Sequence, residues 1–200
     1  AVLVDAVGPT VSSVGVPANA TYLAGQNLDF TINTSENVTV DETGGTPELS
    51  LTIGSTARQA TYQSGSGSSA LVFRYTIQTN DEDTDGITVG TLALSSGTMK
   101  DGAGNDLNLT LNSVGSTASV LVDAVAPTIS SVSVPAADTY LVGETLSFTV
   151  NTTENVTVST GGGTPHLPLT IGATAREAVY VSGSSTSALV FSYTVQAGDN

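Results

Sequence analysis

Residues 70–78 read ALVFRYTIQ, and this stretch decides the fold class because its apolar and polar side chains alternate. The large apolar residues from Leu71 to Ile77 would all lie on one face of an extended chain. An alternation with a period of two residues is typical of a half-buried β-strand, whereas a helix repeats every 3.6 residues. The sequence therefore predicts a strand here, entered through the turn-forming run SGSGSS at residues 64–69.

The same alternation, interrupted by regularly spaced glycines, continues on both sides of this stretch. It predicts a series of short strands in the first half of the chain, with an additional strand or arm at residues 107–111. Short strands separated by turn residues in this way are typical of an all-β, antiparallel β-sandwich of the immunoglobulin type. The predicted strands cover residues 10–17, 26–33, 47–53, 57–63, 69–78, 87–95 and 116–122.

The chain contains an internal repeat, because VDAVGPT at residues 4–10 returns as VDAVAPT at residues 122–128. The repeated Asp5 and Asp123 are 118 residues apart. The same offset relates SENVTV to TENVTV and ALVFRYTIQ to ALVFSYTVQ without a gap. Self-similarity at a fixed period indicates tandem structural units.

The repeat predicts the domain organisation of the chain. We expect residues 1–4 to be the tail of a preceding repeat and residues 5–122 to form a first immunoglobulin-like repeat. Residues 123–200 would form a second repeat. That second repeat would be truncated, because residue 200 corresponds to residue 82 and the last two predicted strands of the sandwich would be missing.

Composition excludes several functional classes. The chain of 200 residues has a formal net charge of −14, and only four of its residues are Lys or Arg. Such a chain repels nucleic acid and anionic membranes, and it has no apolar run of the roughly 18 residues that span a bilayer. The absence of cysteine excludes disulfides and thiolate metal sites. We therefore expect no nucleic-acid partner and no membrane insertion.

The acidic run DEDTDG at residues 81–86 predicts a calcium-binding loop, because its alternate aspartates resemble the opening of an EF-hand. A complete EF-hand is excluded, since its twelfth position is Leu92 and the residues that follow the loop read as a strand. An ordinary solvated acidic turn is the alternative. The ligands predicted in the loop are Asp81, Asp83, Asp85 and the carbonyl of Ile87.

Two further ligands for this loop are predicted at the junction between the repeats. In an immunoglobulin-like topology the loop lies at the same end of the sandwich as the exit strand, which ends at Asp123. Glu154 belongs to the loop of the next repeat that would face this end. The sequence thus predicts a calcium ion held between the two repeats.

A second acidic set is predicted at the opposite end of the first repeat, where the topology brings three separate segments together. The turn DGAGND at residues 101–106 supplies part of this set, and its glycines would equally suit a turn without any ion. Hard oxygen ligands of this kind suit Ca²⁺. The ligands predicted here are Asp5, Glu36, Asp101, Asn105 and Asp106.

These motifs together resemble a known class of protein. VDAVAPT, SENVTV, LTIG, ALVFSYTVQAGDN, DTDG and DGAGND are similar to the bacterial Ig-like repeats that occur in tandem in giant secreted adhesins, including RTX adhesins exported by type I secretion. The resemblance implies an extracellular, cell-surface spacer that serves cell adhesion and biofilm formation. Its partners would be neighbouring repeats of the same chain, and Ca²⁺ would stiffen the joints between them.

Two other functions remain open on the sequence. The sandwich could be a module that binds a carbohydrate, ice or a protein, or a filament subunit completed by strands of another copy. Near-identity of the two repeats favours the spacer.

An enzyme is not expected. The only histidine, His166, is replaced by Glu48 in the first repeat, and the serines lack a general base. Arg58 and Arg176 occupy equivalent positions, and we expect each to anchor a carboxylate or to pack its stem on the sheet.

Overall fold

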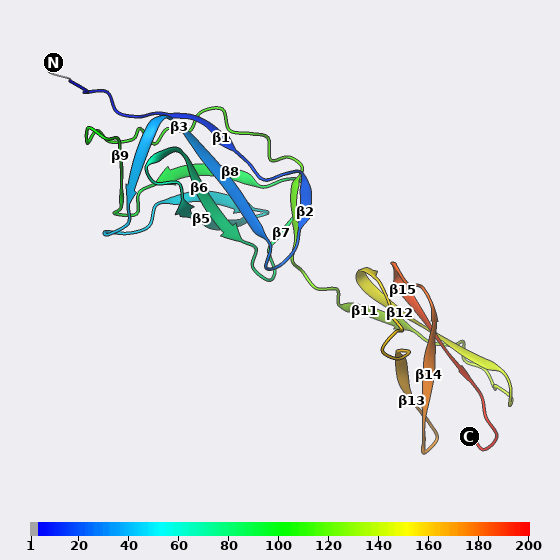
Figure 1. The fold of residues 1–200 in the computed structure, drawn as a ribbon. Helices are drawn as coiled ribbons and strands as arrows, with labels where there is room; N and C mark the ends of the chain where they lie inside the picture. Colours follow the sequence, from blue (N-terminus) through cyan, green and yellow to red (C-terminus); the bar gives the residue numbers. More distant parts are fainter. Residues whose placement is uncertain (1–3) are drawn as a thin grey trace. The chain divides into compact units, whose positions relative to one another are not determined.

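The computed structural model describes residues 4–200, which form β-strands and no helix. Two compact units divide between Val125 and Ala126 (Figure 1). The prediction of an all-β fold is confirmed, and both units contain antiparallel sheets. Within the described residues, no helix is present that could cross a membrane.

The larger sheet of unit 1 contains six strands that alternation predicts and one, β9, that it does not. Its order is β1-β3-β6-β5-β4-β8, every neighbouring pair is antiparallel, and a seventh strand, β9, pairs with the end of β3. The strands are β1 (Val11–Gly15), β3 (Asn27–Asp41), β4 (Glu48–Ile53), β5 (Thr56–Ser64), β6 (Ser68–Thr76), β8 (Thr88–Ala93) and β9 (Thr98–Lys100).

A smaller sheet of three strands completes unit 1, in the order β2-β10-β7. It contains β2 (Ala20–Tyr22), β7 (Glu82–Asp83) and β10 (Val120–Asp123). The strand β10 is antiparallel to β7 but parallel to β2. Val120 and Val122 are almost completely buried, so β10 contributes one face to the core of unit 1.

The core of unit 1 lies on the apolar face of the larger sheet. Phe30 pairs with Phe73 across β3 and β6, and both side chains are fully buried. The ring of Tyr62 meets that of Phe73 edge to face, with centroids 5.8 Å apart, which is a favoured geometry for aromatic pairs. The alternation seen in the sequence is therefore the alternation between core and solvent.

The strand β3 is longer than predicted. We expected a strand over residues 26–33 and a loop that carries Glu36, but the chain continues as a strand to Asp41 after a bulge between Asn33 and Val38. Val38 is fully buried and β9 pairs with the last residues of β3, which explains the extension. Glu36 therefore lies in a bulge and not in a free loop.

The predicted arm at residues 107–111 runs beside β1. Thr10 forms a parallel bridge with Asn108, and Val14 forms another with Val114. Leu107 is 5% exposed, so the arm closes one side of the core. The N-terminal segment of unit 1 thus runs parallel to its C-terminal segment from β1 through β2.

Unit 2 repeats the larger sheet with five strands in the order β11-β12-β15-β14-β13. Phe148 pairs with Phe191 as Phe30 pairs with Phe73, and Tyr180 meets Phe191 at the same centroid distance of 5.8 Å. The strands are β11 (Ile129–Ser133), β12 (Thr145–Val156), β13 (His166–Ile171), β14 (Thr174–Ser182) and β15 (Thr186–Thr194).

The apolar face of unit 2 is more open than that of unit 1. Ile129 is 67% exposed, whereas the equivalent Val11 is 2% exposed against its own core. Leu169 is half-buried, whereas its counterpart Leu51 is buried. Residues 126–200 therefore contain the repeated sheet without the covering layer that unit 1 places on it.

Candidate metal centre

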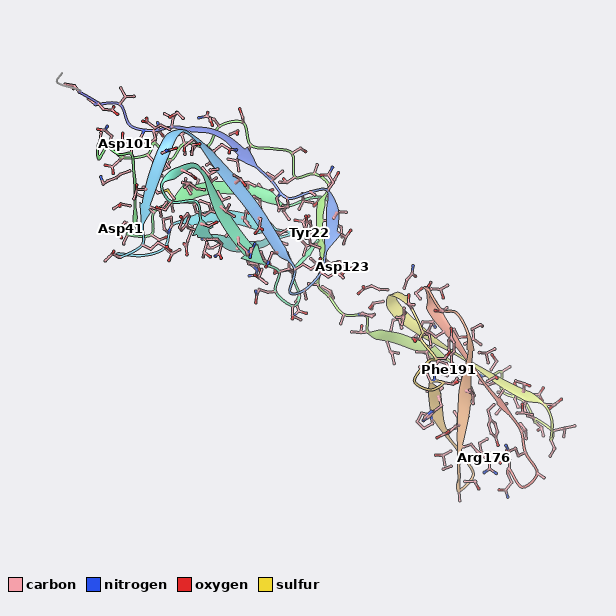
Figure 2. All side chains as sticks on the ribbon, in the orientation of Figure 1. Tyr22, Asp41, Asp101, Asp123, Arg176 and Phe191 are labelled. Atoms are coloured by element: carbon pink, nitrogen blue, oxygen red, sulfur yellow. The ribbon has the colours of Figure 1, made fainter. Side chains whose placement is uncertain are left out.

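Three of the five carboxylate and amide residues predicted at one end of unit 1 meet as a cluster. Asp5, Glu36 and Asp101 each offer a carboxylate oxygen, and these oxygens lie within 4.8 Å of one another. They come from the N-terminal segment, the bulge of β3 and the turn after β9. Figure 2 labels Asp101 at this end of unit 1 and Asp123 at the other.

The bulge of β3 is tied to the N-terminal segment, which brings Glu36 and Asp5 together. The Ser35 N–H donates to the Thr10 carbonyl over 2.9 Å, and the Thr10 N–H donates to the Ser35 hydroxyl oxygen over 3.0 Å. Inside the bulge, the Thr34 hydroxyl donates to the Glu36 carbonyl over 2.6 Å. These bonds fix the backbone on both sides of the two carboxylates.

A close approach of two backbone segments positions the third carboxylate. A Cβ atom on Gly8 would lie 2.4 Å from the Asp106 carbonyl oxygen, so only glycine allows the N-terminal segment to pass this close to the turn at residues 101–106. The Asn108 N–H also donates to the Pro9 carbonyl over 2.9 Å.

The turn itself holds Asp101 in a single orientation. Its Oδ2 accepts a hydrogen bond of 2.8 Å from the Asn105 side-chain amide, and its Oδ1 accepts bonds from the N–H groups of Ala103 and Asn105. These bonds, that of the Asn105 side chain first, lower the pKa of Asp101 below its ordinary value of 3.8. Asp101 is therefore a fixed, ionised carboxylate.

The other two predicted ligands have different partners. The side-chain NH₂ group of Asn105 donates to Asp101 over 2.8 Å and so positions that carboxylate, but this bond does not use the amide oxygen, which is the atom that would bind an ion. Asp106 turns to Lys100, whose ammonium lies 2.6 Å from its Oδ1. Of the five predicted ligands, Asp5, Glu36 and Asp101 bring their carboxylate oxygens together, and ligation by the amide oxygen of Asn105 stays a prediction.

The cluster carries three acidic groups without a basic partner among the described residues, since the ion pairs found there involve other carboxylates. Like charges this close repel one another, and a divalent cation would relieve the repulsion. Ca²⁺ takes six to eight oxygen ligands, so backbone carbonyls and water would have to supplement the carboxylates.

The acidic loop at the other end of unit 1 differs from the prediction. Asp81 is buried, and its Oδ1 accepts bonds from Nε and Nη2 of Arg58 at 2.8 and 2.5 Å. Its Oδ2 accepts bonds from the Tyr75 hydroxyl at 2.5 Å and from the Gln78 N–H at 2.9 Å. Each oxygen of Asp81 therefore accepts two protein hydrogen bonds, which occupy both of its lone pairs, whereas Asp101 Oδ2 accepts only one such bond. We call this arrangement the aspartate corner of unit 1.

The remaining predicted ligands of this loop also have protein partners or point outward. Asp83 accepts bonds from the N–H groups of Gly54 and Gly86 at 2.6 and 2.7 Å. The Ile87 carbonyl accepts the Thr117 hydroxyl, and Asp85 is exposed. These contacts argue against a calcium loop at residues 81–86, because the carboxylates tie the loop to the rest of unit 1.

The two ligands predicted at the junction belong to different units. Asp123 is exposed at the end of β10 in unit 1. Glu154 lies in a bulge of β12 in unit 2, where the Thr152 hydroxyl donates to its carbonyl over 2.6 Å, as Thr34 does for Glu36. The calcium ion between the repeats stays a prediction.

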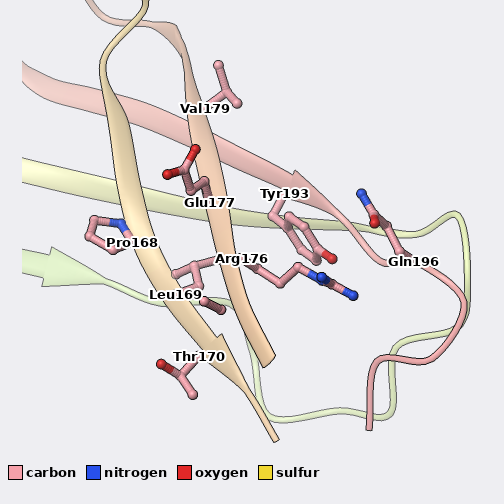
Figure 3. Close-up of a pocket in the computed structure, with 9 residues that line it drawn as sticks. Pro168, Leu169, Thr170, Arg176, Glu177, Val179, Tyr193 and Gln196 are labelled. Atoms are coloured by element: carbon pink, nitrogen blue, oxygen red, sulfur yellow. The ribbon is translucent and has the colours of Figure 1, made fainter. Parts of the chain in front are cut away.

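Unit 2 contains the same aspartate corner. Arg176 Nη2 lies 2.9 Å from Asp199 Oδ1, and the hydroxyl of Tyr193 donates to Asp199 Oδ2 over 2.6 Å. Of the two roles predicted for the repeated arginines, the first is confirmed, because each of them anchors a carboxylate. Figure 3 shows Arg176 and Tyr193 beside the hollow of about 600 Å³ that they help to line.

The surroundings of Asp81 and Tyr75 set the protonation states of both side chains in the corner of unit 1. Burial alone would raise the pKa of Asp81, but the bonds from Arg58, Tyr75 and Gln78 outweigh it and lower the pKa. Burial and the neighbouring carboxylate together raise the pKa of Tyr75 to about 12. Asp81 is thus ionised and Tyr75 is neutral at ordinary pH, as their hydrogen bond requires.

Sequence reasoning missed the part that tyrosine plays in the corner. The available signal was the spacing of six residues from Tyr75 to Asp81, which recurs from Tyr193 to Asp199. Comparison with protein-family models, with curated proteins and with solved structures finds no match to this chain, so its function has to be argued from the geometry and chemistry of its own residues.

Proposed function

We propose that this chain is a spacer made of tandem immunoglobulin-like repeats from a bacterial surface adhesin, and that Ca²⁺ stiffens it. The ion would bind Asp5, Glu36 and Asp101 at the N-terminal end of unit 1. The observation that carries this proposal is the convergence of these three carboxylates within 4.8 Å of one another. The resemblance of the repeated motifs to adhesin repeats supports the cellular role.

The position of the cluster suits a stiffening role. Asp5 lies on the segment that enters unit 1, while Glu36 and Asp101 belong to the body of the unit. An ion shared by the three would fasten the entering segment to the sandwich. Val4 and Val7 on this segment are 85% and 73% exposed, so apolar packing contributes little to holding it.

The expected energy of binding is large enough to matter. Extracellular calcium modules bind with dissociation constants of about 0.1–1 mM. A hundredfold excess of free ion over the dissociation constant adds about 2.7 kcal/mol to the folded state. Domains of this size are stable by about 5–15 kcal/mol, so the ion would supply a substantial fraction of the stability of unit 1.

The test compares thermal unfolding in CaCl₂ and in excess EGTA for the parent chain and for Glu36→Gln. The parent should unfold at a higher temperature with Ca²⁺, and most of that shift should disappear in Glu36→Gln. Glu42→Gln is the control, because it removes the charge of an exposed carboxylate of unit 1 that lies outside the cluster, and it should retain the shift. Titration calorimetry with CaCl₂ measures binding directly.

A parent chain whose unfolding temperature is the same with and without Ca²⁺, and which gives no calorimetric signal, would contradict the proposal. A shift that Glu36→Gln leaves intact would place the ion elsewhere.

A filament subunit is a second candidate, favoured by the open apolar face of unit 2. Ile129 and Val132 are 67% and 44% exposed, whereas their counterparts Val11 and Val14 in unit 1 are both 2% exposed, and residues 108–114 run beside β1 there. Strands of another copy would cover such a face. Sedimentation over a range of concentrations tests this, and a single monomeric species throughout would exclude it.

A further inference from the structure

The chain leaves unit 1 through a pair of backbone hydrogen bonds at the aspartate corner. The Asn80 N–H donates to the Ala124 carbonyl over 2.9 Å, and the Ala124 N–H donates to the Asp81 carbonyl over 2.9 Å. Ala124 is only 8% exposed and belongs to the core cluster of unit 1. The chain thus stays attached to unit 1 one residue beyond the end of β10 at Asp123.

The side chain of Asp81 makes this attachment point rigid. Its carboxylate is fully buried and accepts bonds from Arg58, Tyr75 and the Gln78 N–H, which come from β5, from β6 and from the segment after β6. The corner therefore cannot move without breaking charge-assisted bonds to two strands of the larger sheet.

Asn80, whose N–H bonds the Ala124 carbonyl, has a left-handed backbone conformation. Asn80 has a φ of 71°, a region that asparagine and glycine adopt more readily than other residues. The equivalent residue in unit 2 is Gly198, with a φ of 94°. The repeat thus keeps the same backbone turn with the two residue types that tolerate it.

The linker that remains is short. On the side of unit 2, the Thr128 N–H donates to the Thr153 hydroxyl over 2.9 Å, and the Thr153 N–H donates to the Thr128 carbonyl over 2.8 Å. Between the attached residues Ala124 and Thr128 lie Val125, Ala126 and Pro127. The ring of Pro127 fixes one more backbone angle.

We propose that the aspartate corner of unit 1 is a metal-independent clamp that fixes the exit of the chain and confines bending to residues 125–127. That the clamp would stiffen a spacer rests on the proposed function. The clamp itself consists of hydrogen bonds and uses no ion. Asp81 is a positioning residue in this scheme. It acts on the linker through the backbone carbonyl that it holds in place.

Hydrogen exchange in the parent chain gives the first test, and it is done in excess EGTA. The Asn80 and Ala124 amides should exchange at least about tenfold more slowly than the Val125 and Ala126 amides, because their N–H groups are bonded inside unit 1. Equal exchange at Ala124 and Val125 would overturn the clamp. This measurement does not depend on any variant folding.

The second test measures the spread of distances between the two units. The chain has no native cysteine, so Thr88→Cys in unit 1 and Ser147→Cys in unit 2 place spin labels on two exposed strand positions. Asp81→Asn should broaden the distance distribution, both with Ca²⁺ and in EGTA. Asp199→Asn is the matched control, because it changes the corner of unit 2, which does not hold this linker.

The outcomes separate the clamp from the calcium proposal. Broadening in Asp81→Asn together with no response to Ca²⁺ would support the clamp and contradict the calcium-stiffened spacer. A distribution that narrows with Ca²⁺ but is unchanged in a folded Asp81→Asn chain would overturn the clamp alone.

Discussion

Replacing Tyr75 by Phe isolates the contribution of one hydrogen bond in the aspartate corner. Tyr75 is 7% exposed, and Phe keeps its ring in place, so the change removes only the hydroxyl that donates to Asp81. A hydrogen bond to a charged group contributes about 1.5–3 kcal/mol. Asp81 keeps its bonds from Arg58 and Gln78 and is not left unpaired. We therefore expect unit 1 to lose about 1.5–2 kcal/mol of unfolding free energy, in the lower part of that range.

The assay is urea unfolding in excess EGTA, followed by amide NMR signals that report on each unit separately. Tyr62→Phe is a control inside unit 1, because its hydroxyl oxygen accepts a bond from the uncharged Ser66 N–H at 2.7 Å. Its loss should cost about 1 kcal/mol. Tyr193→Phe should destabilise unit 2 and leave unit 1 unchanged, since it removes the equivalent donor to Asp199. A loss below about 0.5 kcal/mol in Tyr75→Phe, which is the range of neutral surface changes, would refute the reasoning.

Two further predictions follow from the corner and from the carboxylates. Asn80→Gly should leave the stability of unit 1 nearly unchanged in the same urea assay. Asn80→Val should lower that stability by about 1–3 kcal/mol, because a β-branched residue is strained at a φ of 71°. Equal stability of the two variants would count against this strain. Folding lowers the pKa values of Asp81 and Asp101 in unit 1 and of Asp199 in unit 2. The unfolded chain therefore binds protons more readily than the folded chain. Both units should lose stability as the pH falls from about 5 through the ordinary aspartate pKa of 3.8 and on through the lower pKa values of the folded state. Unfolding midpoints measured from pH 6 to pH 3 check this, and a midpoint that stays constant or rises toward pH 3 would contradict it.

Much of the fold could be predicted because strand alternation is a local property of the sequence. The spacing of Leu71 and Phe73 is enough to predict that both side chains are buried. The repeat predicts that the pairing of β3 with β6 recurs in unit 2, as it does between β12 and β15. The continuation of β3 was missed because Ser35, Glu36 and Asn37 are turn-forming or polar residues. The buried Val38 that resumes the strand follows a bulge, which breaks the simple period of two.

The candidate sites divide in the same way. The meeting of Asp5, Glu36 and Asp101 could be predicted, because the strand order assumed from the sequence places their three segments at one end of the unit. The acidic loop at residues 81–86 could not be judged from its spacing. Whether its carboxylates are free to bind an ion depends on the side chain of Arg58, which lies 23 residues before Asp81, and on backbone N–H groups such as that of Gly54. A sequence motif gives the number of carboxylate oxygens but not the donors that already occupy them.

The parallel course of the two terminal segments of unit 1 has a mechanical consequence. The residues from Thr10 to Tyr22 run parallel to those from Asn108 to Val122, with bridges at both ends of this range. When the chain is stretched, its two ends pull these segments in opposite directions along their length, so their hydrogen bonds are sheared together and do not open one after another. Resistance to stretching is governed by the rate of unfolding and not by equilibrium stability. We expect unit 1 to withstand a high pulling force for its size, which is a property that the proposed spacer would need.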